Sequence, residues 1–242
     1  MIIGGLEKLT LLDYPDHLAA IVFTQGCNFR CHFCYNPMLV LSREGADEKN
    51  IKKEKGFSEI FPEDLFLFLE SRRGRLDGVV ITGGEPTLHA DLPNFIKKIK
   101  SLGYDVKLDT NGTNPTMLRS LIKAKLIDYV AMDLKAPFEK YELTTGVPVN
   151  CNNLGKSVKI IMTSGLPYEF RTTVVPGLLV ASDFTKMGQI IAGADKWYLQ
   201  KFKSDTGLVD TKYQSKKAYS NKEMLEFAKL GAQYTKLCEV RS

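Results

Sequence analysis

Short apolar runs alternate with amphipathic stretches along most of the chain, and this alternation predicts βα units around a parallel sheet. One of them, 79–81, is wholly apolar, as a strand covered on both faces requires, and six runs in all are predicted as strands. They span residues 20–23, 79–81, 106–108, 129–132, 170–175 and 197–199. Proline, N-cap and glycine signals place helices between them, and a final amphipathic helix is predicted over 224–237. The expected fold class is α/β, an incomplete (β/α)6 barrel of the TIM type that is open along one side.

Polar motifs follow these strands where each one ends. Gly83-Gly84-Glu85-Pro86 comes after the second run, Asp109-Thr110-Asn111-Gly112 after the third and Asp133-Leu134-Lys135 after the fourth. A cysteine-rich loop follows the first run. Because loops at the carboxyl edge of parallel strands converge on one mouth, these motifs are predicted to share a site.

Three of the five cysteines lie close together, at Cys27, Cys31 and Cys34, in the spacing C-x3-C-x2-C. One disulfide cannot account for three such thiols, so they are read as metal ligands. Three thiolates without an obvious fourth partner suit a [4Fe-4S] cluster whose fourth iron stays open to a small molecule. A zinc site would need a fourth ligand, which His32 inside the loop is badly placed to supply, and an accidental grouping of cysteines is the other alternative.

The remaining candidate side chains are given structural roles. Cys151 and Cys238 are interpreted as unpaired residues, and His17 and His89 stand in no recognised ligand pattern. Residues 43–59 carry five basic and five acidic side chains without an apolar period, so they form a predicted insertion, either a surface loop or a lid or partner contact.

Bulk properties suit one domain over residues 1–242, with a core of about 18–202 and a C-terminal basic helical extension over 203–242. The net charge of +5 falls entirely within residues 196–242. No signal peptide or long apolar run is present, so a cytoplasmic protein with no membrane contact is expected. Aromatic residues are too sparse among the C-terminal lysines to predict nucleic-acid binding.

The motifs together resemble those of the radical SAM superfamily, whose members use S-adenosylmethionine (SAM). Within it the chain is similar to the activating enzymes of glycyl-radical enzymes, and most of all to the branch that activates anaerobic ribonucleoside-triphosphate reductase. The likeness runs from residue 3 to about 202. It rests on residues 4–6, 13–15, 23–31, 35–37, 81–87, 108–114, 131–137 and 171–177.

The resemblance implies a set of site residues. Cys27, Cys31 and Cys34 would hold the [4Fe-4S] cluster. The residues expected to contact SAM are Phe33, Tyr35, Gly83, Gly84, Glu85, Asp109, Asn111, Asp133, Lys135, Arg171 and Gln200. Asp109 and Asp133 also resemble a monovalent-cation site of relatives, while Phe202 stands where relatives often have a histidine. Alternative roles stay open: a turn at Asp109 and Asn111, a solvated Lys135 and a core-packing Tyr35.

The resemblance also implies a reaction and partners. A low-potential donor, flavodoxin or ferredoxin, would reduce the cluster. SAM would then be cleaved to methionine and a 5′-deoxyadenosyl radical. This radical would form a glycyl radical on a partner enzyme. We expect the partner's glycine loop to enter beside strand 197–199 and the C-terminal segment, near Lys212, Lys216 and Lys217. A radical SAM synthase that contracts a pterin to 7-carboxy-7-deazaguanine is the nearest alternative, and a zinc-bound interaction module is a remote one.

Overall fold

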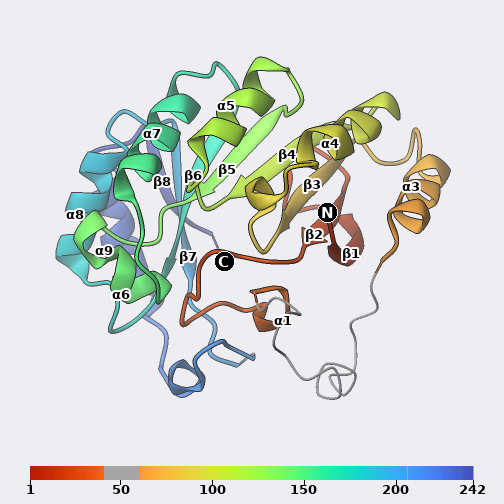
Figure 1. The fold of residues 1–242 in the computed structure, drawn as a ribbon. Helices are drawn as coiled ribbons and strands as arrows, with labels where there is room; N and C mark the ends of the chain where they lie inside the picture. The colour runs from red at the N-terminus through yellow and green to blue at the C-terminus, as the bar shows by residue number, and fades with distance from the viewer. Residues whose placement is uncertain (41–59, 206, 242) are drawn as a thin grey trace. The chain divides into compact units, whose positions relative to one another are not determined.

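The fold is described from a computed structural model, which covers residues 1–40, 60–205 and 207–241 (Figure 1). The predicted insertion at 43–59 lies outside the described residues. The chain divides into two compact units. The first comprises residues 1–28, 38–110 and 116–130, and the second comprises residues 29–37, 111–115 and 131–242. The expectation of a single domain stays a prediction.

The first unit contains a four-stranded run of sheet in chain order. Its strands are β1 (Ile3–Thr10), β2 (Ala19–Thr24), β3 (Gly78–Gly83) and β4 (Asp105–Thr110). β1 is antiparallel to β2, whereas β2, β3 and β4 are parallel. Thr24, the last residue of β2, is in register with Gly83, the last residue of β3. The loop with Cys27 and the glycine motif therefore leave the sheet at the same edge.

The helices of the first unit lie between its strands, as predicted. They are α3 (Pro62–Ser71), α4 (Leu92–Ser101) and α5 (Pro115–Lys123), and the short α1 (Pro37–Val40) follows the cysteines. Proline occupies the first turn of α3 and α4, where its missing N–H leaves no intrahelical bond unmade. Tyr14, from the loop between β1 and β2, is buried in a core cluster with Ile21, Val80 and Tyr129. This packing gives the tyrosine of the Asp13-Tyr14-Pro15 motif a structural role.

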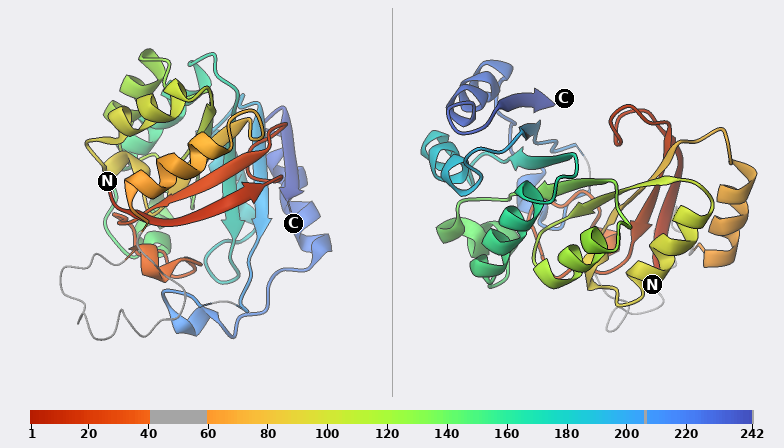
Figure 2. Two further views of the ribbon diagram at one scale, coloured as in Figure 1. Left: turned by 90° about the vertical axis from the view of Figure 1, so that its right-hand side faces the viewer. Right: turned by 90° about the horizontal axis from the view of Figure 1, so that it is seen from above.

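The second unit contains three parallel strands and the helices that cover them. The strands are β6 (Tyr168–Val174), β7 (Lys196–Lys201) and β8 (Leu237–Arg241), and β5 (Tyr129–Asp133) runs from the first unit into the second. The helices are α6 (Tyr141–Thr145), α7 (Cys151–Met162), α8 (Ala181–Ile190) and α9 (Asn221–Gly231), with 3-10 turns η2 (Phe138–Lys140) and η3 (Thr211–Tyr213). Figure 2 shows α8 and α9 next to each other on one side of these strands.

All six predicted strands are present, together with two that the sequence analysis missed. β1 adds an antiparallel edge to β2, and β8 adds a parallel strand to β7. The predicted helix 224–237 extends too far, because α9 ends at Gly231 and Leu237 is the first residue of β8. β8 also occupies the edge of β7. The expected entry of a partner loop beside β7 and the C-terminal segment stays a prediction.

Candidate active site

In the first unit the glycine motif lies directly against the loop that carries Cys27. The Gly84 N–H donates to the Thr24 carbonyl oxygen and the Glu85 N–H to the Gly26 carbonyl oxygen, both at 2.8 Å. A Cβ on Gly84 would lie 2.0 Å from the Gly26 oxygen, and Gly83 has φ +109°. Glycine is therefore required at position 84 because two backbones touch here.

Glu85 is 1% exposed, and its carboxylate is directed into the protein. Oε1 accepts hydrogen bonds from the Thr87 amide N–H at 3.1 Å and from the Thr110 hydroxyl at 2.8 Å. Thr110 is the last residue of β4, so this buried carboxylate connects the ends of β3 and β4. Its local role is to hold the glycine motif in place, which makes Glu85 a supporting residue in the first unit.

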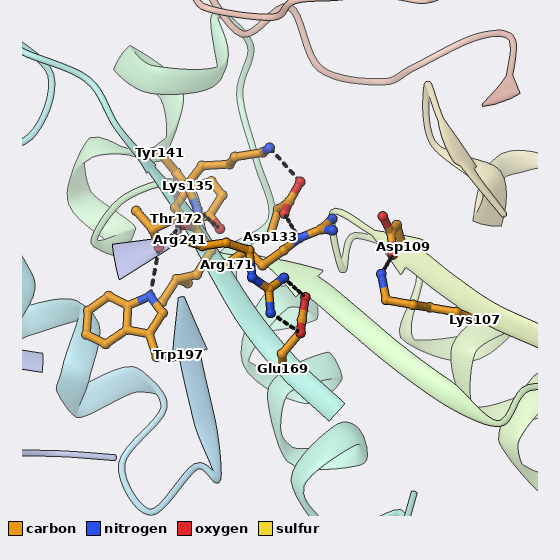
Figure 3. A network of polar contacts seen from close by, with 11 residues as sticks. Lys107, Asp109, Asp133, Lys135, Tyr141, Glu169, Arg171, Thr172, Trp197 and Arg241 are labelled. Carbon is orange, nitrogen blue, oxygen red and sulfur yellow. Dashed lines mark hydrogen bonds and ion pairs between the residues drawn. The ribbon is translucent and has the colours of Figure 1, made fainter. Parts of the chain in front are cut away.

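Asp109, near the end of β4, is paired with a buried lysine. Lys107 is 1% exposed, and its Nζ lies 2.5 Å from Asp109 Oδ1 (Figure 3). The two side chains project from the same face of β4, because they are two residues apart. The Asp109 carboxylate thus already has a cationic partner within its unit, and the monovalent-cation site stays a prediction.

In the second unit, α6 supports the part of the cysteine loop that carries Cys31 and Cys34. The Arg30 N–H donates to the Thr145 carbonyl oxygen at 2.8 Å, and the Phe29 ring packs edge-on against Tyr141. Cys31 is buried, whereas Cys34 is partly exposed. Its N–H donates to the Cys31 carbonyl oxygen at 3.1 Å, which folds the segment between the two thiols into a turn.

The motif after β5 forms an ion-pair network with β6 (Figure 3). Lys135 Nζ lies 2.8 Å from Asp133 Oδ2, and Arg171 Nε lies 2.9 Å from Asp133 Oδ1. Burial opposes the charge of Asp133, but Arg171 and Lys135 outweigh it and hold the pKa of this carboxyl well below its usual range. Lys135 is 16% exposed, so the alternative of a solvated loop lysine is wrong.

Lys135 also connects the network to the cysteine loop. Burial opposes its charge, yet Asp133 and then Cys31 and Cys34 raise the pKa of its ammonium above the usual range. Its Nζ lies 5.9 Å from the centroid of the Phe33 ring, which is buried. The Tyr141 hydroxyl accepts the Lys135 backbone N–H at 3.0 Å, so α6 positions this loop as well.

A second ion pair, which the sequence analysis missed, lies on the same strand as Arg171. Glu169 on β6 is fully buried and accepts two hydrogen bonds from the Arg241 guanidinium, at 2.9 and 3.1 Å (Figure 3). The guanidinium carbon lies 3.7 Å from the centroid of the Tyr198 ring on β7. Glu169 lies one residue before the predicted strand 170–175, so nothing in the sequence pattern singled it out. The pair fixes the end of β8 to β6.

Three further candidate residues have defined local surroundings. Asn111 Oδ1 accepts from the Thr113 N–H at 3.0 Å, which is the turn proposed as an alternative role for Asn111. Tyr35 stacks on Phe202, and its hydroxyl accepts the Lys203 backbone N–H at 2.8 Å. Gln200 lies near the carboxyl end of β7, in register with Thr173 and Arg241.

The chemistry of the cysteine loop fits an iron–sulfur cluster. Thiolates are the ligands of such clusters, and in the second unit the charges of Cys31 and Cys34 act on the largely covered ammonium of Lys135. None of the five cysteines is in a disulfide, which confirms that Cys151 and Cys238 are unpaired. His32 is directed at Asp210, with Nδ1 3.4 Å from Oδ2, which fits its expected exclusion from the ligand set. Among the described residues no helix is both long and apolar enough to cross a membrane.

Comparison with known proteins defines the class of this α/β chain. The Radical SAM superfamily model matches residues 21–180, more than half of the sequence. The chain belongs to the radical SAM superfamily, and it is an enzyme that uses a [4Fe-4S] cluster and S-adenosylmethionine. The fold class of an incomplete parallel barrel is confirmed.

Among curated relatives, the chain is similar to a Methanocaldococcus jannaschii protein named as a glycyl-radical enzyme activating enzyme. The two are 31% identical over 96% of this chain and 92% of the relative. It is 29% identical to the pyruvate formate-lyase-activating enzyme of Staphylococcus epidermidis, over 79% of this chain and 75% of that one.

Solved structures support the fold. Streptococcus suis SuiB bound to its precursor peptide SuiA has a TM-score of 0.66 at 16% identity, over 92% of this chain and 48% of SuiB. The chain thus spans about half the length of SuiB. Escherichia coli QueE has a TM-score of 0.51 at 20% identity, over 82% of both chains. At these identities the likeness concerns the fold alone.

Proposed function

We propose that this enzyme generates a glycyl radical on a partner enzyme, and that the partner is an anaerobic ribonucleoside-triphosphate reductase. The observation that carries the activase function is the likeness to an activating enzyme over nearly the full length of both chains. The choice of partner rests on the motifs of the sequence, chiefly residues 108–114 and 131–137.

Cys27, Cys31 and Cys34 are proposed to hold the cluster through three irons, which leaves the fourth iron for SAM. When bound, the cluster and SAM together supply a reductive cleavage whose 5′-deoxyadenosyl radical takes a hydrogen atom from the partner's glycine. The protein supplies position and charge. Two hydrogen bonds between the glycine motif and residues 24 and 26 support this assignment, because they set the backbone directly before Cys27.

Lys135 is proposed to bind the carboxylate of SAM, and Asp133 the ribose. The network of Asp133, Lys135 and Arg171 supports these roles because it holds both charges in fixed directions beside Cys31 and Cys34. Phe33 and Tyr35 are proposed to lie against the cofactor, with Tyr35 near adenine. Gln200 and the main chain of Gly83 and Gly84 complete the proposed contacts.

The test is an anaerobic activation assay with reconstituted enzyme, SAM and a reductant. The anaerobic ribonucleotide reductase and the pyruvate formate-lyase of the same organism are offered separately, and the glycyl radical is measured by electron spin resonance. We expect a radical on the reductase, with methionine released only when SAM and reductant are both present.

Two outcomes would overturn the proposal. A radical on pyruvate formate-lyase alone would refute the choice of partner but keep the activase function. Absence of a radical on either enzyme, together with turnover of a free pterin substrate, would assign the chain to the deazaguanine synthases. A colourless, zinc-loaded protein from oxygen-free preparation would refute cluster chemistry altogether.

A further inference from the structure

Two consecutive residues of the cysteine loop contact different parts of the second unit. Phe33 is buried, and its ring lies near the Lys135 ammonium. His32 is directed instead at residues 208–217, the segment that we call the strap. One side of the cysteine loop therefore faces the charges that are proposed to bind SAM, and another side lies under the strap.

The strap is fixed to His32 by three contacts. The Asp210 N–H donates to the His32 carbonyl oxygen at 3.0 Å, and the Asp210 carboxylate lies 3.4 Å from His32 Nδ1. The Tyr213 ring stacks on the imidazole, with centroids 5.6 Å apart and an interplanar angle of 11°. Leu208 anchors the beginning of the strap in the core, at 5% exposure.

Lys216 fastens the other end of the strap. Its Nζ lies 4.5 Å from the Tyr213 ring centroid and donates to the Pro176 carbonyl oxygen at 3.3 Å. This lysine is therefore a structural cross-link and a poor candidate for contacting a partner. The stack His32, Tyr213, Lys216 leads from a residue next to Cys31 out to the strap.

Three exposed lysines lie in or near the strap in the sequence. Lys212 and Lys217 lie within the strap beside Tyr213 and Lys216, and the backbone of Lys203 is hydrogen bonded to Tyr35. One exposed acid, Asp205, lies nearby in the sequence, while Asp210 is engaged with His32. Among the described residues of 203–217 the exposed charge is thus predominantly positive.

We propose that Lys203, Lys212 and Lys217 form the docking surface for an acidic electron-transfer protein that reduces the cluster. The inference rests on Cys31 and Cys34 being cluster ligands, as proposed above. A redox protein docked over Tyr213 would be separated from the loop by little more than the stacked rings of Tyr213 and His32. The SAM-binding side of the loop would meanwhile remain available to the other partner.

A charged surface suits this partner better than a large apolar one. Electron-transfer encounters are small and short-lived, and complementary charge raises their association rate without requiring a tight complex. The donor gives one electron to the cluster and leaves one electron more oxidised. The oxidised donor must then dissociate, and a surface that raises the association rate without tight binding allows this. The glycyl-radical partner, by contrast, has to deliver a peptide loop to the cofactor.

The test measures cluster reduction directly, without any glycyl-radical enzyme. Reconstituted enzyme is mixed anaerobically with reduced flavodoxin, and the cluster absorbance is followed in a stopped-flow instrument. The variant is Lys212→Glu with Lys217→Glu. The matched control, Lys156→Glu with Lys159→Glu on α7, makes the same change in net charge at two exposed lysines of the same unit. Iron content and thermal unfolding verify that each protein is intact.

We expect the strap variant to lower the second-order rate constant roughly tenfold at low salt, with the difference disappearing at high salt. The α7 control should change it little, and reduction by dithionite should be equal in all three proteins. An unchanged flavodoxin rate would overturn the proposal. So would a variant that is reduced normally but fails to form a radical on the glycyl-radical enzyme, since that result would assign the lysines to the other partner. Failure of the activase function alone would leave the reduction assay unaffected.

Discussion

Replacing Gly84 by alanine tests whether contact between two backbones, and not open space for the cofactor, explains the glycine motif. The added Cβ would lie 2.0 Å from the Gly26 oxygen and 2.6 Å from its carbonyl carbon. Non-bonded carbon contacts normally lie at about 3.5 Å or more, so one segment must move by roughly 1.5 Å. A shift of that size breaks the hydrogen bonds that Gly84 and Glu85 donate to Thr24 and Gly26.

The cost follows from those two hydrogen bonds. A buried backbone group left without a partner costs about 1–3 kcal/mol, so the Gly84→Ala protein should lose roughly 2–6 kcal/mol of unfolding free energy. For a chain of this size that corresponds to a fall of roughly 5–20 °C in Tm. Because Gly26 directly precedes Cys27, the iron content after anaerobic reconstitution should fall too.

Gly155→Ala is the matched control for this substitution. Gly155 lies inside α7, and the nearest atom to an added Cβ would be 3.9 Å away, on Phe138. Alanine should therefore stabilise this helix by about 0.5–1 kcal/mol. Thermal unfolding of the apo proteins and iron analysis of the reconstituted ones distinguish the outcomes. Wild-type Tm and iron content in Gly84→Ala would refute the close-contact explanation.

Three further predictions concern the second unit. Asp133→Asn removes the charge that pairs with Lys135 and Arg171, so the free energy of unfolding should fall by about 2–4 kcal/mol. The affinity for SAM, measured by calorimetry, should fall as well. An unchanged Tm would contradict the role of this ion-pair network. The Thr144 hydroxyl is buried and has no hydrogen-bond partner among the described residues, so Thr144→Val should leave Tm equal or higher. A clear fall in Tm would contradict this. Burial and the nearby Glu239 raise the pKa of the Cys238 thiol to about 12, which means roughly a thousandfold less thiolate than at its ordinary pKa. Cys238 should resist iodoacetamide at pH 8–9 in folded protein and react on unfolding, as peptide mass spectrometry can verify. Stability should also decline as pH rises from about 9 towards 12, because only the unfolded chain releases this proton; a Cys238→Ala protein with the same decline would disprove that cause.

The sequence determined the parallel strands and the chemistry at their ends. Buried strands such as β3 and β5 are continuous apolar runs, and each delivers a polar motif at its carboxyl end, so local pattern was enough to find them. The cysteine spacing likewise predicted the cluster ligands and indicated the family, and the family is confirmed. The sequence did not predict the contacts that hold these motifs in place. Glu85 turns inward towards Thr110, and Lys135 lies over the Phe33 ring; both neighbours are more than twenty residues away in the chain.

Only the tertiary structure decided the C-terminal region. Leu237–Arg241 is five residues long and partly exposed, so its pattern could not separate it from the end of an amphipathic helix. Hydrogen bonds from β7 and the ion pair between Arg241 and Glu169 make it a strand. The same limit applies to the strap, where lysines that looked equivalent in sequence have different roles: Lys216 is bound to Tyr213 and Pro176, and Lys212 is exposed. Non-local contacts set these roles, because neither a short edge strand nor an exposed loop carries enough local pattern to fix its own surroundings.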